Sequence, residues 1–369
     1  MTRKLKILIS GGGTGGHIFP ALSIANEIRE MKPDTEFLFV GAEGRMEMER
    51  VPAAGYKIVG LPIIGFPRKP GIKMLKFFVN LARSMRSARR VVKHFNPDVV
   101  VGVGGYASGP ILRVAANLKF PSLIQEQNSY AGITNRLLAK RADQICVAYD
   151  HMEKYFPAAK IVYTGNPVRK ELLEGKSKLA EALAFYQLDP SKKVLLVVGG
   201  SLGARTLNNS LFKDLELLRD SNIEVLWQTG KYYYQSVLEK TRGLNLSNVH
   251  IHEFLTRMDL AYVASHLVIS RAGAGTISEL CLMEKATILV PSPNVAEDHQ
   301  TKNAKALVEK DAAIMISDRE CEEQLIPTAL KLIQETDELK KLEQNIKQLA
   351  RPDAAKHIAK MVIGLAKKQ

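Results

Sequence analysis

Several features are scarce or missing in this 369-residue sequence, and each gap removes a class of protein. The three cysteines, Cys146, Cys281 and Cys321, lack the spacing of a zinc site or a disulfide framework, which indicates a reducing compartment. Because no uninterrupted apolar run reaches about 18 residues, we expect no transmembrane helix. The apolar run at residues 5–9 meets glycine too soon to form the core of a signal peptide.

Acidic residues are absent from one long stretch. Between Arg50 and Pro97 there are 11 basic residues and no acidic one. Residues 1–165 hold 24 Lys+Arg against 12 Asp+Glu, so +12 of the net charge of +14 lies there. Such a field favours an anionic partner, namely a nucleic acid, a phosphorylated substrate or a membrane surface. Nucleic acid ranks low, because aromatic-rich basic loops and known binding modules are missing.

Short apolar runs alternate with amphipathic segments throughout the chain. This alternation is typical of an α/β protein in which parallel strands are joined by crossover helices. The runs predict thirteen strands, at residues 5–10, 37–40, 57–61, 99–103, 122–124, 144–147, 161–163, 194–198, 224–227, 250–251, 267–269, 288–290 and 313–316. The clearest helical patterns lie at residues 20–31, 72–94 and 352–368.

Both halves of the chain open alike, with an apolar strand, a glycine cluster and a helix. The clusters are residues 11–16 and 199–203. We therefore expect two Rossmann-like domains that face each other, with a ligand cleft at the carboxyl ends of their strands. The turn signal Gly-Asn-Pro at residues 165–167 starts the linker, which gives domains at 1–165 and 166–350. Residues 351–369 form a final helix that we expect to pack back on the first domain.

The first glycine cluster invites a rival interpretation. Gly11, Gly13 and Gly16 satisfy the dinucleotide-binding pattern, in which backbone N–H groups approach an anion. That fold also needs an acidic residue at the end of the second strand, and the nearest candidate, Glu43, comes late. The loop ends instead in an ionisable group, His17. NAD or FAD binding is therefore disfavoured, and we expect no cofactor.

Seven motifs occur along the chain in a fixed order. They are Gly-Gly-Thr-Gly-Gly-His at 12–17 with Pro-Ala-Leu at 20–22, Gly-Gly-Tyr-Ala-Ser-Gly-Pro at 104–110, Glu-Gln-Asn at 126–128, Gly-Asn-Pro-Val-Arg at 165–169, Gly-Gly-Ser-Leu-Gly-Ala at 199–204, Ser-Arg-Ala-Gly-Ala-Gly-Thr-Ile-Ser-Glu at 270–279 and Asp-His-Gln-Thr-Lys-Asn-Ala at 298–304. Together they resemble the MurG family of glycosyltransferases over nearly the whole chain. Two departures, Gln125 in place of a histidine and Gly275 in place of a bulkier apolar residue, affect only fine geometry.

The resemblance implies a GT-B fold, with the donor held mainly by residues 166–350 and the acceptor mainly by residues 1–165. It also implies a reaction. N-acetylglucosamine (GlcNAc) moves from UDP-GlcNAc to the 4-hydroxyl of the muramyl sugar of lipid I, with inversion, and the product is lipid II. Lipid I is undecaprenyl-diphosphate-linked MurNAc-pentapeptide.

The resemblance also assigns substrate-binding residues. Glu279 accepts the ribose hydroxyls, Gln300 contacts the GlcNAc ring, and the backbone of Leu255 contacts uracil. Arg169 contacts the donor or stabilises domain closure. The remaining donor-facing positions are Thr14, Gly15, Gly16, Asn128, Ala274, Gly275, Thr276, Ile277 and Ser278. The alternatives are purely structural roles, in which Glu279 caps a helix and Leu255 is a core residue.

The departing diphosphate also needs stabilisation. Metal-dependent transferases commonly hold a cation with Asp-x-Asp, which occurs nowhere in this sequence. We therefore expect no metal. Instead, we expect backbone N–H groups and helix N-termini to stabilise the negative charge of UDP. Ser201 with its glycines is the leading diphosphate contact, although residues 199–203 could simply form a tight turn. The histidines His250 and His252 alternate along a strand, and a metal role for them is disfavoured.

Two residues compete as the general base. An imidazole can take the acceptor proton as attack begins, which favours His17 at the end of the polyglycine loop. A lone histidine can also be purely structural. Glu126 is the alternative, because a partly buried carboxylate can hold a proton near neutral pH.

The basic stretch predicts a membrane-docking surface. Residues 61–67 are apolar and punctuated by Gly and Pro, and Arg68 and Lys69 follow. The helix at 72–94 then carries basic residues beside apolar ones, as an interfacial segment among anionic headgroups needs. The alternative is a core helix with a solvated basic face. We expect a peripheral enzyme on the cytoplasmic face of the cell membrane.

The alternative function is that of a related enzyme, a UDP-sugar-dependent diacylglycerol glycolipid synthase of related fold.

Overall fold

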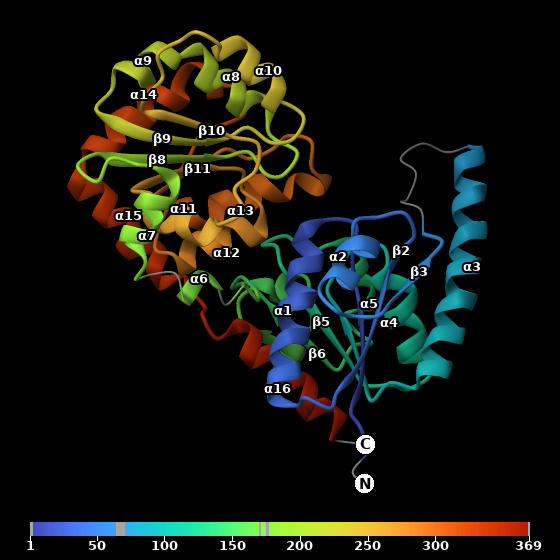
Figure 1. Ribbon diagram of the computed structural model, residues 1–369. Helices are drawn as coiled ribbons and strands as arrows, with labels where there is room; N and C mark the ends of the chain where they lie inside the picture. Colours follow the sequence, from blue (N-terminus) through green and yellow to red (C-terminus); the bar gives the residue numbers. More distant parts are fainter. Residues whose placement is uncertain (1–2, 64–70, 170, 175–176, 368–369) are drawn as a thin grey trace. The chain divides into compact units, whose positions relative to one another are not determined.

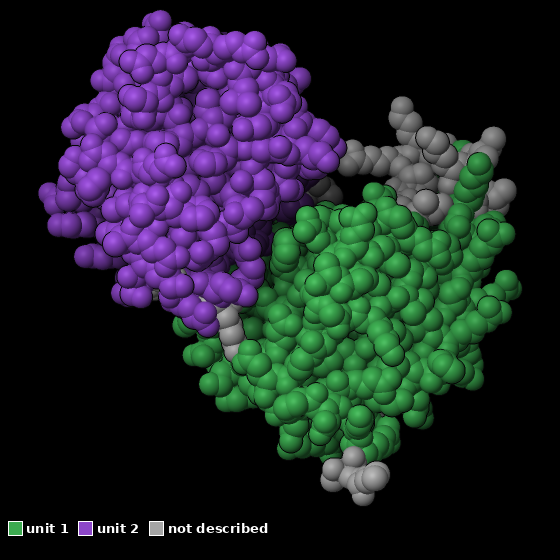
Figure 2. All heavy atoms as spheres, in the orientation of Figure 1, with its two compact units in different colours: residues 1–168, 351–369 green, residues 169–350 purple. Residues whose placement is uncertain are grey.

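The chain divides into two compact units. A computed structural model describes residues 3–63, 71–169, 171–174 and 177–367. Unit 1 comprises Met1–Val168 and Arg351–Gln369, and unit 2 comprises Arg169–Ala350 (Figure 2). The carboxyl-terminal segment thus belongs to the same unit as the start of the chain.

Unit 1 is built on a seven-stranded parallel sheet (Figure 1). Its strands are β1 (Lys6–Ser10), β2 (Glu36–Ala42), β3 (Ile58–Leu61), β4 (Val99–Gly102), β5 (Ser122–Glu126), β6 (Gln144–Val147) and β7 (Ile161–Tyr163), in the order β3-β2-β1-β4-β5-β6-β7. Its helices are α1 (Gly15–Met31), α2 (Glu47–Ala53), α3 (Ile72–Phe95), α4 (Ser108–Asn117), α5 (Ile133–Leu138), the 3-10 turns η1 (Met152–Lys154) and η2 (Ala158–Lys160), and α16 (Ala354–Ala366).

Successive residues of β1 show why helices cover both faces of this sheet. Ile7 and Ile9 pack with buried residues of α1 and α16, whereas Leu8 belongs to the core formed with α3, α4 and α5. A strand buried on both faces has no polar side, so its sequence is a continuous apolar run. This arrangement confirms the predicted α/β fold with parallel strands.

Unit 2 repeats the plan with six parallel strands. They are β8 (Lys193–Val198), β9 (Ile223–Gln228), β10 (Val249–His252), β11 (Leu267–Ser270), β12 (Thr287–Leu289) and β13 (Ile314–Met315), in the order β10-β9-β8-β11-β12-β13. The helices are α6 (Glu171–Glu174), α7 (Leu179–Tyr186), α8 (Arg205–Lys213), α9 (Leu215–Asp220), α10 (Tyr234–Thr241), α11 (Met258–Ala264), α12 (Ala274–Leu282), η3 (Ala296–Asp298), α13 (His299–Val308), α14 (Cys321–Gln334) and α15 (Thr336–Gln348). In Figure 1 α8, α10 and α14 cover one face of the sheet, and α11, α12 and α13 cover the other.

The strand order fixes where a ligand belongs in each unit. Order reverses between β1 and β4 in unit 1, and between β8 and β11 in unit 2. In open α/β sheets, ligands bind beyond the carboxyl ends of the strands at such switch points. The loops that follow these four strands carry four of the seven sequence motifs.

Candidate active site

The loops after β1 and β4 touch at the switch point of unit 1. A β-carbon on Gly105 would overlap the Gly12 carbonyl, and one on Gly11 would overlap the Val103 side chain. Gly105 also has a positive φ of 79°, which side chains rarely adopt. Glycine is therefore needed here for close approach of two backbones, which explains the pair of glycine motifs.

His17 lies in the first turn of α1, against this junction. Its Nδ1 is 2.9 Å from the Val103 carbonyl oxygen and 3.1 Å from Oε1 of Gln127. Both partners are acceptors, so Nδ1 carries the proton in the neutral ring and Nε2 carries the lone pair. A β-carbon on Gly104 would lie 2.9 Å from Cε1 of His17, so the missing side chain makes room for the ring.

A buried amide network holds the partner of His17. Gln127 donates from Nε2 to the Val103 carbonyl at 2.7 Å and also contacts Oε1 of Gln125. Gln125 in turn donates to Oδ1 of Asn166 at 2.9 Å, and Asn166 donates to the Gln127 carbonyl at 3.0 Å. The departure at position 125 is thus a fully buried, hydrogen-bonded residue. Gln127 is a positioning residue that the sequence motifs contained but did not single out.

Glu126 is buried and accepts hydrogen bonds from four groups. The Asn128 amide N–H and Nδ2 lie 3.1 and 3.3 Å from Oε1. The Gly132 amide N–H and Nδ2 of Asn135 lie 3.0 and 2.8 Å from Oε2. These four donors occupy about as many acceptor positions as a carboxylate has. The geometry therefore suits Glu126 to holding the loop that carries Asn128.

The other candidate positions of the first glycine loop are accessible. Thr14 and Gly16 are exposed, and Gly15 is half-buried at the start of α1. Thr14 has an extended conformation and makes no side-chain cap bond. Their placement beyond β1 is compatible with contact to a substrate.

In unit 2 the loop after β8 is packed as closely as the first glycine loop. A β-carbon on Gly203 would overlap the Thr229 carbonyl, and Gly200 and Gly203 have φ values of 86° and 89°. Gln228 donates from Nε2 to the Gly200 carbonyl at 3.0 Å. Ser201 is exposed at the tip of this loop, before α8 begins. The tight turn and a diphosphate contact are therefore compatible roles.

The donor motif at 270–279 forms the loop after β11 and most of α12. Ala274 and Ile277 are buried and face the core, whereas Gly275, Thr276 and Ser278 are half-buried. Ser278 donates to the Ala274 carbonyl at 2.9 Å. The predicted set thus divides between residues that support the helix and residues that a ligand could reach.

Glu279 is held in a defined orientation by two partners within unit 2. Arg169 Nη2 lies 3.0 Å from Oε1, and the Tyr262 hydroxyl donates to Oε2 at 3.1 Å. Burial lowers the pKa of Arg169, but Glu279, together with Tyr262 and Glu171, outweighs that effect and the net pKa is raised. Burial, and after it Glu279, raises the pKa of Tyr262 well above its ordinary value, so the hydroxyl remains a donor. A carboxylate has about four acceptor positions, so two more donors could bind here.

Gln300 and Leu255 differ in accessibility. Gln300, near the start of α13, is half-buried and accepts a hydrogen bond from the Ser292 amide N–H at 2.8 Å through Oε1. The Leu255 side chain is buried, so only its backbone could contact a base. His250 binds Glu224 at 2.7 Å through Nε2. Burial lowers the pKa of His252, and His250 lowers it further.

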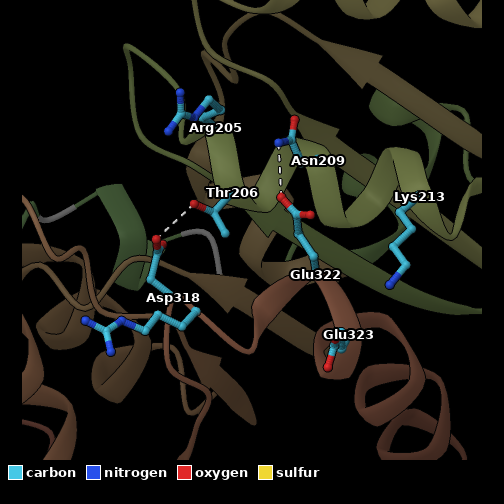
Figure 3. Close-up of a pocket in the computed structure, with 8 residues that line it drawn as sticks. Arg205, Thr206, Asn209, Lys213, Asp318, Glu322 and Glu323 are labelled. Atoms are coloured by element: carbon cyan, nitrogen blue, oxygen red, sulfur yellow. Dashed lines mark hydrogen bonds between the residues drawn. The ribbon is translucent and has the colours of Figure 1, made fainter.

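A polar hollow lies between α8 and the start of α14 (Figure 3). It is lined by Arg205, Thr206, Asn209, Lys213, Asp318, Arg319, Glu322 and Glu323. Thr206 donates to Oδ2 of Asp318 at 3.0 Å, and Asn209 donates to Oε1 of Glu322 at 3.1 Å. Asp318 also pairs with Arg271 of the donor motif. Asp318 therefore joins the first turn of α8 to the loop after β11, a link that no sequence motif predicted.

The two halves of α3, the predicted docking helix, differ in how much of their side chains is buried. Its second half packs through Ser84, Ala88 and Val92, which are buried. Its first half exposes Phe78 (56 %), Val79 (46 %) and Leu81 (38 %). In Figure 1 this half extends past the other helices of unit 1. Residues 64–67 of the predicted apolar loop at 61–67, together with Arg68 and Lys69, lie outside the described residues.

The described residues contain neither a membrane-spanning helix nor a metal-binding cluster. Among residues 3–63, 71–169, 171–174 and 177–367, no helix is long and apolar enough to cross a membrane. The same part of the chain contains no group of three His, Cys, Asp or Glu side chains arranged to hold a metal ion.

Two family models match this chain. The Glycosyltransferase family 28 N-terminal domain matches residues 7–147, and the Glycosyltransferase family 28 C-terminal domain matches residues 194–358. The two matches together cover well over half of the sequence, and both glycine loops and the α12 motif lie within them.

Two proteins that match this chain over at least 99% of its length carry the same enzyme name. A protein of Parabacteroides distasonis is 58% identical over 367 residues, which is 100% of this chain and 100% of the relative. A protein of Bacteroides thetaiotaomicron is 58% identical over 99% of each chain. Both are named UDP-N-acetylglucosamine–N-acetylmuramyl-(pentapeptide) pyrophosphoryl-undecaprenol N-acetylglucosamine transferase.

Solved structures agree in fold. Acinetobacter baumannii MurG is 27% identical, with a TM-score of 0.75 over 98% of this chain and 100% of that chain. The UDP-GlcNAc 2-epimerase of Neisseria meningitidis is 15% identical, with a TM-score of 0.67 over 98% of this chain and 100% of that one. The second likeness concerns the fold alone.

Proposed function

The chain belongs to the MurG transferases of glycosyltransferase family 28, and from this membership we propose that it transfers GlcNAc from UDP-GlcNAc to lipid I. The acceptor atom is the 4-hydroxyl of the muramyl sugar, and the products are lipid II and UDP. The observation that carries this proposal is 58% identity over the full length of relatives named for this reaction. Transfer to diacylglycerol, the rival function, has no comparable support.

On the acceptor side, the proposed base is His17. Nδ1 is committed to the Val103 carbonyl and Gln127, so Nε2 is the nitrogen that takes the proton of the acceptor hydroxyl. The acceptor oxygen then bonds to the anomeric carbon of GlcNAc while the bond from that carbon to the UDP oxygen breaks. Attack opposite to the leaving group inverts the configuration. Glu126 holds the loop that carries Asn128.

On the donor side, the proposed contacts lie beyond the strands of unit 2. Glu279, held by Arg169 and Tyr262, accepts the ribose hydroxyls, and Gln300 contacts the GlcNAc ring. Ser201 and the amide groups at the start of α12 meet the diphosphate, whose negative charge is favoured at a helix N-terminus. Leu255 contributes its backbone to uracil recognition.

We also propose a membrane-docking surface, formed by the exposed apolar residues of α3 and its arginines. Phe78, Val79 and Leu81 would enter the interface, while Arg83 and Arg86, both exposed, would face anionic headgroups. The lipid-linked acceptor in the relatives' names supports this assignment, because the enzyme must reach a substrate that stays in the membrane. Docking on the cytoplasmic face fits the three buried cysteines, as thiols persist in that compartment.

The acceptor is tested by offering the enzyme two of them separately. UDP-GlcNAc with a labelled sugar is incubated with a lipid I analogue or with diacylglycerol in detergent. We expect label in the lipid I analogue and none in diacylglycerol. Label in diacylglycerol alone would assign the chain to glycolipid synthesis instead.

A further inference from the structure

A carboxylate that no sequence motif singled out lies beneath the first glycine loop. Glu47, at the start of α2, is only 1 % exposed. Its Oε2 accepts the Gly13 amide N–H at 3.0 Å, and its Oε1 accepts the Ala42 amide N–H at 3.0 Å. One side chain therefore joins the loop after β1 to the end of β2.

Two glycines leave the space that this carboxylate fills. A β-carbon on Gly12 would overlap Oε1 of Glu47, and one on Gly41 would lie 2.5 Å from its Cγ. Gly12 also has a φ of 153°, in the region that side chains rarely adopt. The glycines around Glu47 are thus matched to the carboxylate.

The hydrogen bond to Gly13 changes what the glycine loop can do. In loops of this pattern, backbone N–H groups are usually turned to a bound phosphate. Here the Gly13 N–H is used by an acidic group of the chain itself, so the loop is ordered without a ligand. The next residue, Thr14, accepts the His17 N–H at 3.1 Å and the Ile18 N–H at 3.3 Å, and so begins the turn that carries the proposed base.

We infer that Glu47 is a positioning residue, which acts through Gly13 and Thr14 to set the place of the His17 imidazole for the proposed transfer to lipid I. The inference rests on the proposed function only where activity is the readout. Both oxygens of the Glu47 side chain accept a backbone N–H, whereas an amide would present a donor to one of these two N–H groups.

Asp98 offers a matched control, because it also accepts a backbone N–H, at the start of β1. It is 9 % exposed, and its Oδ2 accepts the Lys6 amide N–H at 2.8 Å. Its other oxygen pairs with Arg3 at 2.8 Å. Glu47 and Asp98 each accept a backbone N–H, Asp98 from Lys6 at the start of β1 and Glu47 from Gly13 in the loop beyond its end, and of the two only Glu47 contacts the glycine loop.

The test compares Glu47→Asp, Glu47→Gln and Asp98→Asn with wild type. For each we would measure kcat with the lipid I analogue, KM for UDP-GlcNAc, Tm, and the imidazole ¹⁵N resonances of His17, assigned with His17→Ala. Glu47→Asp keeps the charge but is one methylene too short to reach both N–H groups, so it remains informative if Glu47→Gln does not fold. We expect both Glu47 variants to lose about 10- to 100-fold in kcat, with KM for UDP-GlcNAc within about twofold of wild type. The His17 resonances of both Glu47 variants should shift. Asp98→Asn should lower Tm but should neither reduce kcat nor shift the His17 resonances.

Two results would overturn the inference. One is a folded Glu47→Asp enzyme with wild-type kcat and unshifted His17 resonances. The other is a loss of kcat in Asp98→Asn that equals the loss in Glu47→Asp at equal Tm, which would mean that general destabilisation explains both. An inactive wild-type enzyme would contradict the proposed function instead, and the His17 resonances would still test the role of Glu47.

Discussion

The His17 side chain has a defined tautomer, because both groups near Nδ1 are acceptors. The ring is held in place before any substrate arrives, so the proposed proton transfer to His17 would need no reorientation of the imidazole. A preorganised base is effective because it avoids paying for orientation during the reaction.

We expect His17→Ala to lower kcat by about 10²- to 10⁴-fold while UDP affinity stays close to wild type. Steady-state kinetics and calorimetric UDP titration would measure the two quantities. His151→Ala is the control, because this histidine is highly exposed in the same unit. A near-normal kcat for His17→Ala would move the base to Glu126, whose Glu126→Gln variant should then be inactive.

Glu279 and Gln300 should matter for the donor. Glu279→Ala removes the shared partner of Arg169 and Tyr262, and Gln300→Ala removes the acceptor of the Ser292 N–H. Each should raise KM for UDP-GlcNAc by about 10- to 100-fold, the range for loss of a hydrogen bond to a charged or buried group. Glu338→Ala, on α15, should leave KM unchanged. Unaltered donor kinetics in both test variants, with folding confirmed by circular dichroism, would reject these assignments.

At the residue scale, the sequence identified side chains that stand inside motifs and overlooked those that hold them. Glu279 and His17 were predicted because they end recognisable segments. Tyr262 and Glu47 were not, because their partners lie 17 and 34 positions away, at separations that correspond to no helical or strand period. Only the folded sheet brings such pairs together.

At the scale of elements, apolar runs located the strands well, because parallel strands buried on both faces carry few polar residues. The β6 and β7 ranges agree with prediction at both ends, and α3 extends one residue further, to Phe95. The first helix was predicted from residue 20 but begins at Gly15. Two glycines are poor helix formers, so the sequence could not show that the glycine loop turns directly into the helix.

The charge of α3 gives a prediction at this scale. Near an anionic leaflet each Lys or Arg contributes about 1 kcal/mol, so four substitutions should reduce vesicle binding by orders of magnitude. The variant replaces four exposed arginines of α3 with Gln: Arg83, Arg86, Arg89 and Arg90. Binding to vesicles containing anionic lipid would be measured by sedimentation at rising salt, and salt should weaken the wild type through screening.

A matched variant controls for the loss of four charges. It replaces lysines of unit 2 with Gln: Lys213, Lys331, Lys340 and Lys341. We expect this control to bind vesicles better than the α3 variant and both to bind UDP normally. Vesicle binding by the α3 variant that equals wild type would mean that another surface docks. Loss of UDP binding in the α3 variant would mean that it has misfolded.

At the scale of the whole molecule, the two units share one architecture but differ in charge. Unit 1 holds 29 Lys+Arg against 13 Asp+Glu, a net charge of +16, whereas unit 2 holds 23 against 25, a net charge of −2. The repeated strand–glycine–helix opening was enough to predict two parallel sheets, since each opening begins a new set of crossovers. The final helix was expected on the first domain, but the sequence did not indicate that α1 is its partner there, because an amphipathic helix does not specify its partner.

The whole sequence also lacks Asp-x-Asp, from which we expect transfer that does not depend on an added divalent cation. Activity should therefore remain substantial in excess EDTA, because amide groups and helix N-termini meet the diphosphate charge. Initial rates with and without EDTA, followed by readdition of Mg²⁺ or Mn²⁺, would test this. Complete loss that the metal reverses would contradict it.

The central claim is that the muramyl 4-hydroxyl of a lipid-linked acceptor receives GlcNAc. It is tested most directly by comparing a lipid I analogue with its 4-deoxy counterpart, using labelled UDP-GlcNAc and mass spectrometry of the lipid product. The account predicts one added GlcNAc, in β linkage by NMR, on the first acceptor and none on the 4-deoxy acceptor. Equal labelling of both acceptors, or an α linkage in the product, would contradict it.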